Sequence, residues 1–357
     1  MQNPWRRAGI TSGVAGRIAI LSAVAGVLVA AILVPLTGLA GVATRDAAKT
    51  FNDLSVQQLG QVPTRSEILD SKGHLIAYYY PNNIYRVPVS YADIAPVMRN
   101  AIVAIEDYRF YKHGAIDPRG TIRAIANDLS HNPVQGGSTL AQQYVKNALI
   151  LTAHTKEQQV EAAADSLDRK IRELRIAADV EHELTKNQLL AAYLNVAYFE
   201  NSAYGIQVAA ERYFSTTANH LTLPESAMLA GMVENPVADD PVTEPKTSKA
   251  RRNTVLFRMA QLHYITEATA IADSKKGLGL HLSPIPQHGC ESASARREPF
   301  FCDYVLAVLR TNTAYAKVQH DLDTTGGLKV YTTLSPDRKS TRLNSSHDIG
   351  SRMPSSA

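Results

Sequence analysis

Two carboxyl groups, Glu106 and Asp107, close the apolar run 101–105 and are followed by aromatic, basic and histidine side chains. An acid beside these aliphatic residues and Phe110 would lose part of its hydration, which raises its pKa toward the range of a useful general base. The alternative is an exposed acid on a solvated helix, and this stretch alone leaves both open. His113 likewise could act in catalysis or serve as a capping or packing residue.

A second polar group follows two glycines. Residues 136–150 open with the glycine pair and Ser138 and continue with a helical pattern. The backbone N–H groups and the positive dipole end of such a helix start favour an anion. Thr139, Gln143 and Lys146 would share one face, and their hydroxyl, amide and ammonium groups suit a phosphate or a sugar. The alternative is ordinary capping with a polar outer face. A Walker loop is excluded, because the lysine lies inside the helix.

A third group, Arg169, Lys170 and Glu173, lies in the stretch 168–174. Its simplest interpretation is a helical ion pair between Arg169 and Glu173, worth roughly 0.2–0.5 kcal/mol. Taken alone, this group therefore does not require a functional site.

Composition limits the class of protein. The chain has 357 residues, an ordinary apolar fraction and a net charge of +4, so it can bury a sizeable core and gives no indication of nucleic-acid binding. Its two cysteines, Cys290 and Cys302, could close one small disulfide loop in a domain outside the cytoplasm. The alternative is a pair of buried thiols.

Residues 18–44 carry no charged side chain and exceed the roughly 20 residues that cross a bilayer. Arg6, Arg7 and Arg17 precede them, which places residues 1–17 in the cytoplasm and the rest of the chain outside. The alternative is a cleaved signal peptide, whose apolar region is usually shorter, about 7–15 residues. We predict a single-pass protein of the cytoplasmic membrane with an extracellular domain.

The pattern of apolar and turn residues predicts the elements that carry these groups. Residues 66–80 favour a hairpin that turns at 70–73, and residues 95–270 favour helix almost throughout. One helix around residues 101–111 would align four side chains on one face: Ile102, Glu106, Phe110 and His113. Asp117 and Pro118 are typical of a further helix start.

Further along the chain, residues 157–184 predict one long amphipathic helix. Capping boxes are expected where Thr185 precedes Gln188 and where Thr222 precedes Glu225. The serine-rich segment 339–357 lacks any core pattern and is predicted to be a non-native tail.

Five motifs in order resemble glycosyltransferase family 51, the peptidoglycan glycosyltransferase domain of class A penicillin-binding proteins. They are Glu106-Asp107-x-x-Phe110-x-x-His113, "GGSTLAQQYVKN", "RKIRE", "YLNVAYF" and "ESAMLAGMVENP". The resemblance covers residues 60–270 and implies a mainly α, lysozyme-like helical domain after one N-terminal transmembrane helix. Residues 271–338 look like the linker of actinobacterial members, leading toward a transpeptidase domain.

The resemblance assigns roles to individual residues. Glu106 matches the base that deprotonates the attacking sugar hydroxyl, and Glu173 matches the second carboxylate. Lys146, Arg169 and Lys170 match the cations around a polyprenyl pyrophosphate leaving group. The remaining substrate-binding matches are Asp107, Phe110, His113, Ser138, Thr139, Gln142, Gln143 and Asn147.

The implied reaction is inverting transfer that polymerises lipid II into glycan strands. The implied partners are lipid II, the growing strand, the membrane and other cell-wall assembly proteins, with no nucleic acid. No cofactor is required by the resemblance, and a divalent cation such as Mg²⁺ at the pyrophosphate stays open. Two other classes remain: a lysozyme-like hydrolase, which uses two carboxyl groups, and a non-catalytic membrane scaffold.

The sequence departs from the family pattern in places. Gly114 directly follows His113, Glu200 replaces a common glycine, and Asp165 replaces a common arginine. The segment 148–168 is also longer than usual. Less positive charge is therefore expected around the pyrophosphate, which bears on relative activity more than on the reaction class. No serine has a lysine three residues later, so we expect no transpeptidase half and no penicillin binding.

Overall fold

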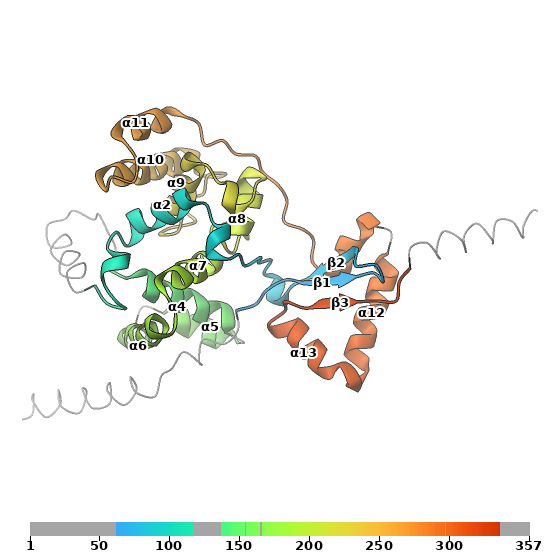
Figure 1. Cartoon of the computed structure of the whole chain (residues 1–357). Coiled ribbons are helices and arrows are strands. Elements are labelled where there is room, and N and C mark those ends of the chain that lie inside the picture. Colours follow the sequence, from blue (N-terminus) through green and yellow to red (C-terminus); the bar gives the residue numbers. More distant parts are fainter. Residues whose placement is uncertain (1–61, 118–136, 154, 165, 297, 336–357) are drawn as a thin grey trace, which may run out of the picture.

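The computed structural model describes residues 62–117, 137–153, 155–164, 166–296 and 298–335. The predicted anchor at 18–44, the helix start at Pro118, the departure at Asp165 and the tail at 339–357 lie outside these residues. Figure 1 shows the described chain as a large helical lobe beside a smaller lobe built on a sheet. No described helix has the length and apolar character needed to cross a membrane.

The smaller lobe contains the predicted hairpin. Strand β1 (Ser66–Leu69) pairs antiparallel with β2 (Leu75–Tyr79), which confirms that prediction. Asp70 stabilises the turn, because its Oδ1 accepts hydrogen bonds from the backbone N–H groups of Lys72 and His74, both at 2.8 Å. Strand β3 (Lys329–Tyr331) pairs parallel with β1 and completes a sheet of order β2-β1-β3.

Residues from the C-terminal segment cover this sheet (Figure 1). Helices α12 (Pro299–Thr311) and α13 (Ala316–Thr324) contribute Leu306 and Leu322 to a core with Ile68 of β1. Cys302 of α12 forms a disulfide with Cys290 in the 3₁₀ helix η7 (Gly289–Arg296). Within the described part of the predicted linker, residues 289–331 therefore contribute helices and a strand, and the strand shares its sheet with a hairpin that the sequence assigned to the 60–270 domain.

The larger lobe is helical, which agrees with the predicted mainly α class. Its α-helices are α2 (Pro96–Glu106), α4 (Leu140–Thr152), α5 (Lys156–Ala163), α6 (Leu167–Glu183), α7 (Lys186–Val196), α8 (Ile206–Phe214), α9 (Leu223–Met232), α10 (Pro245–Gln261) and α11 (Glu267–Lys275). The remaining 3₁₀ helices of the described chain are η3 (Pro81–Asn83), η4 (Tyr91–Asp93), η5 (Phe110–Lys112), η6 (Ala218–His220) and η8 (Thr313–Tyr315).

Helix α2 lies in the middle of the main core. Its residues 101–105 are buried, and it packs against α9 and α10, while α4 packs against α6 and α7. Burial of so much aliphatic surface, at about 25 cal/mol per Å², holds these helices together. The ends of α2 and α4 are thereby fixed next to α6 and to the junction between α9 and α10.

The prediction that one helix aligns Ile102, Glu106, Phe110 and His113 on one face is wrong. Helix α2 ends at Glu106, and Asp107 leaves the helical conformation with φ −154°. The physical reason is a tertiary contact: the Asp107 carboxylate accepts hydrogen bonds from His113 Nε2 at 2.7 Å and from Leu140 N at 3.2 Å. Asp107 reaches both donors from outside the helix, so the chain turns before Phe110.

The single helix expected over 157–184 is also wrong, because α5 and α6 are separate. Ala164 is extended after α5, and Ser166 caps α6 by accepting a hydrogen bond from Arg169 N at 3.2 Å. The Arg169 side chain also donates to the Ala164 carbonyl, which stabilises the break. The two expected capping boxes, at Thr185 and Thr222, are present.

Candidate active site

One cavity of about 230 Å³ gathers most of the predicted site residues. It lies where the end of α2, the first turns of α4 and the start of α6 meet the α9–α10 junction. The predicted residues that line it are Glu106, Ser138, Gln142, Gln143, Lys146, Asn147, Lys170 and Glu173. The other lining residues are Ile105, Val233, Glu234 and Arg251.

Glu106 has the properties of a general base. It is the last residue of α2, and its Oε2 accepts a hydrogen bond from Gln143 Nε2 at 2.9 Å. Burial raises the pKa of Glu106 to about 7, against the opposing effect of the Gln143 hydrogen bond. A carboxylate with a pKa near neutrality can take a proton from a hydroxyl in the transition state.

Glu173 has a different environment. Its side chain is 1% exposed, and its two oxygens face two cations: Arg169 donates to one, and Lys170 Nζ lies 3.5 Å from the other. Lys170 Nζ also donates to Ser138 Oγ at 3.1 Å, so α6 is joined to the entry of α4. Glu173 therefore holds two cations of α6, of which Lys170 lines the cavity.

Lys146 adds a further positive charge to the lining. Within the described residues its ammonium group forms no ion pair, so the charge is available to an anionic ligand. Lys146 and Lys170 together can neutralise phosphate oxygens on the side of the cavity that α4 and α6 form. A leaving group with two phosphates suits this wall.

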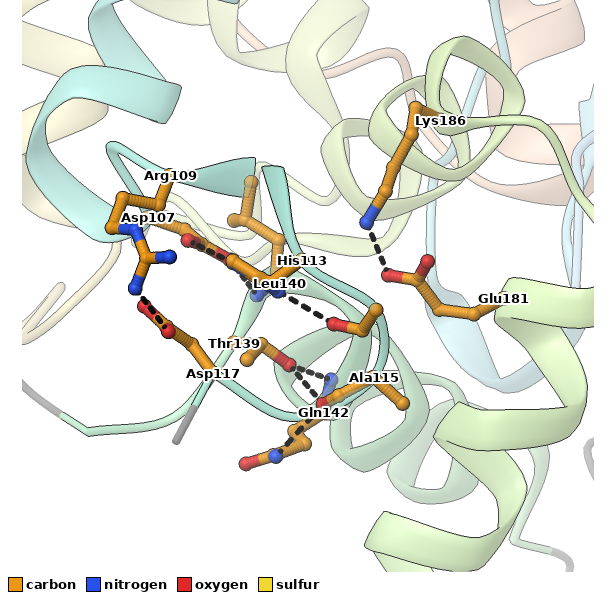
Figure 2. Close-up of polar contacts among 11 residues, drawn as sticks. Asp107, Arg109, His113, Ala115, Asp117, Thr139, Leu140, Gln142, Glu181 and Lys186 are labelled. Atoms are coloured by element: carbon orange, nitrogen blue, oxygen red, sulfur yellow. Dashed lines mark hydrogen bonds and ion pairs between the residues drawn. The ribbon is translucent and has the colours of Figure 1, made fainter. Parts of the chain in front are cut away.

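Other predicted site residues lie outside the lining and support it. Figure 2 shows Asp107 bonded to His113 and to the first backbone N–H of α4. Ala115 accepts hydrogen bonds from Thr139 Oγ1 at 2.9 Å and from Gln142 Nε2 at 3.1 Å. These contacts tie the segment after α2 to the start of α4, so they position the cavity wall.

Three further predicted residues have supporting contacts. Phe110 is fully buried, and the ammonium group of Lys186 lies 4.5 Å from its ring centre. Burial lowers the pKa of His113, but its hydrogen bonds to Asp107 and to the Gly114 carbonyl outweigh that effect and raise the pKa above its ordinary value. Arg169 does not line the cavity, but it pairs with the lining residue Glu173 and so helps to position it.

Sequence reasoning missed Glu234 and Arg251. Arg251 of α10 donates to the Glu234 carboxylate and to the Gly231 carbonyl at 3.2 Å. A Cβ at position 231 would lie 2.9 Å from Arg251 Cγ, so glycine there permits the close approach of α10. The available signal was Glu234 itself, inside the fifth motif "ESAMLAGMVENP".

The described residues do not fit a dedicated protein metal site. Among them, no three His, Cys, Asp or Glu side chains are grouped to hold an ion. Both oxygens of Glu173 already face cations. A divalent cation such as Mg²⁺, carried by the substrate phosphates, stays a prediction.

Comparison with known proteins adds an independent finding. Residues 72–260 match the family described as Transglycosylase. The chain is 35% identical over 246 residues to penicillin-binding protein 1F of Bacillus subtilis. This alignment covers 69% of this chain and 31% of that protein. It is 38% identical over 210 residues to penicillin-binding protein 1A of Mycobacterium tuberculosis, covering 58% and 25% respectively.

A solved structure of penicillin-binding protein 1A from Haemophilus influenzae aligns with a TM-score of 0.36 at 21% identity, over 80% of this chain and 28% of that one. The chain thus spans between a quarter and a third of the length of the proteins it matches.

Proposed function

The chain belongs to the transglycosylase family, and we propose that it polymerises lipid II into peptidoglycan glycan strands. The observation that carries the proposal is that Glu106, whose pKa is about 7, lines the same cavity as the cations Lys146 and Lys170. A base and cations in one cavity suit a displacement in which a sugar hydroxyl attacks and a pyrophosphate leaves.

Glu106 accepts the proton of the acceptor's sugar hydroxyl as that oxygen attacks the anomeric carbon of the growing strand. The new glycosidic bond forms as the bond to the polyprenyl pyrophosphate breaks, and one displacement inverts the anomeric centre. The acceptor hydroxyl is a weak nucleophile, so proton removal by Glu106 supplies much of the rate gain, typically about 10²–10⁴-fold.

Lys146 and Lys170 stabilise the negative charge that develops on the pyrophosphate. Pyrophosphate is already a good leaving group, so charge neutralisation matters more than protonation. Glu173 holds Arg169 and Lys170 in place, which favours a supporting role over that of a proton donor. In a hydrolase of the lysozyme type, the second carboxyl group would act on the sugar or on a water molecule rather than hold two cations.

A membrane location fits the same proposal. Lipid II carries a polyprenyl tail, and a membrane-bound substrate favours a membrane-bound enzyme. We therefore propose that residues 18–44 anchor the chain in the cytoplasmic membrane with the cavity on the outer side. Other cell-wall assembly proteins are proposed partners there.

Polymerisation of lipid II by the purified full chain tests this function. Glu106→Gln keeps the side-chain shape and removes the proton acceptor, so the rate should fall by about 100-fold or more. In the unaltered chain the rate should fall as pH drops below about 7, because Glu106 becomes protonated. Glu267→Gln, an exposed acid of α11, serves as the matched control. Near-normal synthesis by Glu106→Gln would remove the catalytic assignment.

A further inference from the structure

Gln143 connects the proposed base to a buried tyrosine. Its Nε2 donates to Glu106 Oε2 at 2.9 Å, and its Oε1 accepts a hydrogen bond from the Tyr193 hydroxyl, also at 2.9 Å. Tyr193 belongs to α7 and is 1% exposed. It does not line the cavity, so it does not touch a substrate there.

The direction of this chain of hydrogen bonds matters, because a glutamine amide has one donor end and one acceptor end. With the carbonyl end held by Tyr193, the NH₂ end must face Glu106. The reversed amide would turn its carbonyl oxygen toward the carboxylate. In the described part of the structure the Tyr193 hydroxyl has this single hydrogen bond, so reversal would also leave its proton buried without an acceptor.

We propose that Tyr193 is a positioning residue for the transfer reaction: its hydroxyl orients the Gln143 amide so that the amide donates to Glu106 and keeps this side chain as the proton-accepting carboxylate. The O–H of a protonated Glu106 finds no acceptor at Gln143, because Tyr193 holds the amide with its NH₂ group toward the acid. The tyrosine thus favours the charged form of the base without touching the reacting sugar.

Other charged or titratable groups also face Glu106. Glu234 and Asp107 raise its pKa, and Arg251 lowers it. Lys146, Lys170 and Glu173 share the cavity lining. None of these groups is altered when the Tyr193 hydroxyl is removed, so a Tyr193→Phe variant isolates the effect of the amide orientation. The role of Tyr193 in catalysis rests on the proposed function, whereas its effect on the charge of Glu106 does not.

The test measures the titration of Glu106 directly in the purified full chain. The carboxyl carbon signal in ¹³C-glutamate-labelled protein is identified by its loss in Glu106→Gln. In Tyr193→Phe the amide is free to reverse and accept from the protonated acid, so the titration midpoint should rise by about 1 pH unit. Lipid II polymerisation should fall at pH 7 and recover at higher pH.

Tyr213→Phe is the matched control. Tyr213 is also fully buried, and its hydroxyl donates to the Phe199 carbonyl at 2.6 Å, away from Gln143. This variant should leave the Glu106 titration unchanged. Gln143→Met removes the amide and should shift the titration as Tyr193→Phe does, and the double variant should add nothing further. The single variant Gln143→Met also provides the titration measurement if Tyr193→Phe fails to fold.

An unchanged or lowered midpoint in Tyr193→Phe or, where that variant is unfolded, in Gln143→Met overturns the proposal. So does an equal loss of rate at every pH, which is the signature of a merely structural defect. If the unaltered chain does not polymerise lipid II, the proposed function fails, while the titration still decides the role of Tyr193.

Discussion

Replacing Asp107 by asparagine tests how the cavity wall is held. The Asp107 carboxylate accepts from His113 with one oxygen and from Leu140 N with the other. Asparagine keeps the shape but offers one oxygen, and its NH₂ group then faces a donor. One buried donor therefore loses its partner, which costs about 1–3 kcal/mol of unfolding free energy.

The cost should depend on pH. The side chains of His113 and Asp107 are only 4% and 6% exposed, so solvent screens their ion pair little. Because the folded-state pKa of His113 is raised, the pair contributes stability that is fully present below the unfolded pKa of about 6.5. That stability is lost as pH rises through the raised pKa. Breaking a buried charged pair costs about 3–5 kcal/mol, so this larger loss is expected at pH 5.5.

The assay is urea unfolding of the detergent-solubilised full chain, followed by circular dichroism at pH 5.5 and pH 9. Asp107→Asn should lose more stability at pH 5.5 than at pH 9. Asp93→Asn is the control, because Asp93 is exposed and, in the described chain, its carboxylate accepts a hydrogen bond only from Ser90 Oγ. Its change should stay within about 0.5 kcal/mol at both pH values. Equal losses at the two pH values, or a greater loss at pH 9, would refute the assigned His113–Asp107 pair.

Two further predictions concern separate parts of the molecule. Lys146→Met should lower kcat/KM for lipid II by about 10–100-fold, because a charge facing the leaving group is lost. Replacing the exposed Lys246 of α10 by methionine should leave kcat/KM unchanged. Steady-state kinetics compare the two variants, and equal kcat/KM values would exclude Lys146 from the site. Cys302→Ala should destabilise the smaller lobe by about 2–3 kcal/mol, because the disulfide closes a short loop of sequence separation 12. Hydrogen exchange at β1 and β3 measures this change, and unaltered exchange would contradict it.

Sequence reasoning succeeded where the deciding contacts are local. The hairpin depends on Asp70 and its neighbours, and the capping boxes at Thr185 and Thr222 depend on residues three positions apart. The end of α2 was missed because it depends on Leu140, which is 33 residues away from Asp107. The parallel pairing of β1 with β3 joins residues separated by more than 260 positions, and no local pattern reports such a contact.

The candidate site shows the same division. Motif order predicted the residues of α2, α4 and α6 that line the cavity, but spacing alone did not separate lining residues from supporting ones such as Asp107 and Phe110. That distinction depends on where α2 ends. Arg251 was missed because its place beside Glu234 follows from the packing of α10 on α9 at Gly231.

Two glutamates line one cavity, and their neighbours give them different chemistry. Glu106 meets the neutral amide of Gln143, and burial raises its pKa to about 7, which allows it to accept a proton. Glu173 is more buried, yet both of its oxygens are engaged by Arg169 and Lys170. Removing the Glu173 carboxylate would leave a buried cation without its partner. The partners of each acid, rather than its depth, therefore support the proposed roles: Glu106 as the base and Glu173 as the residue that holds the cations of α6.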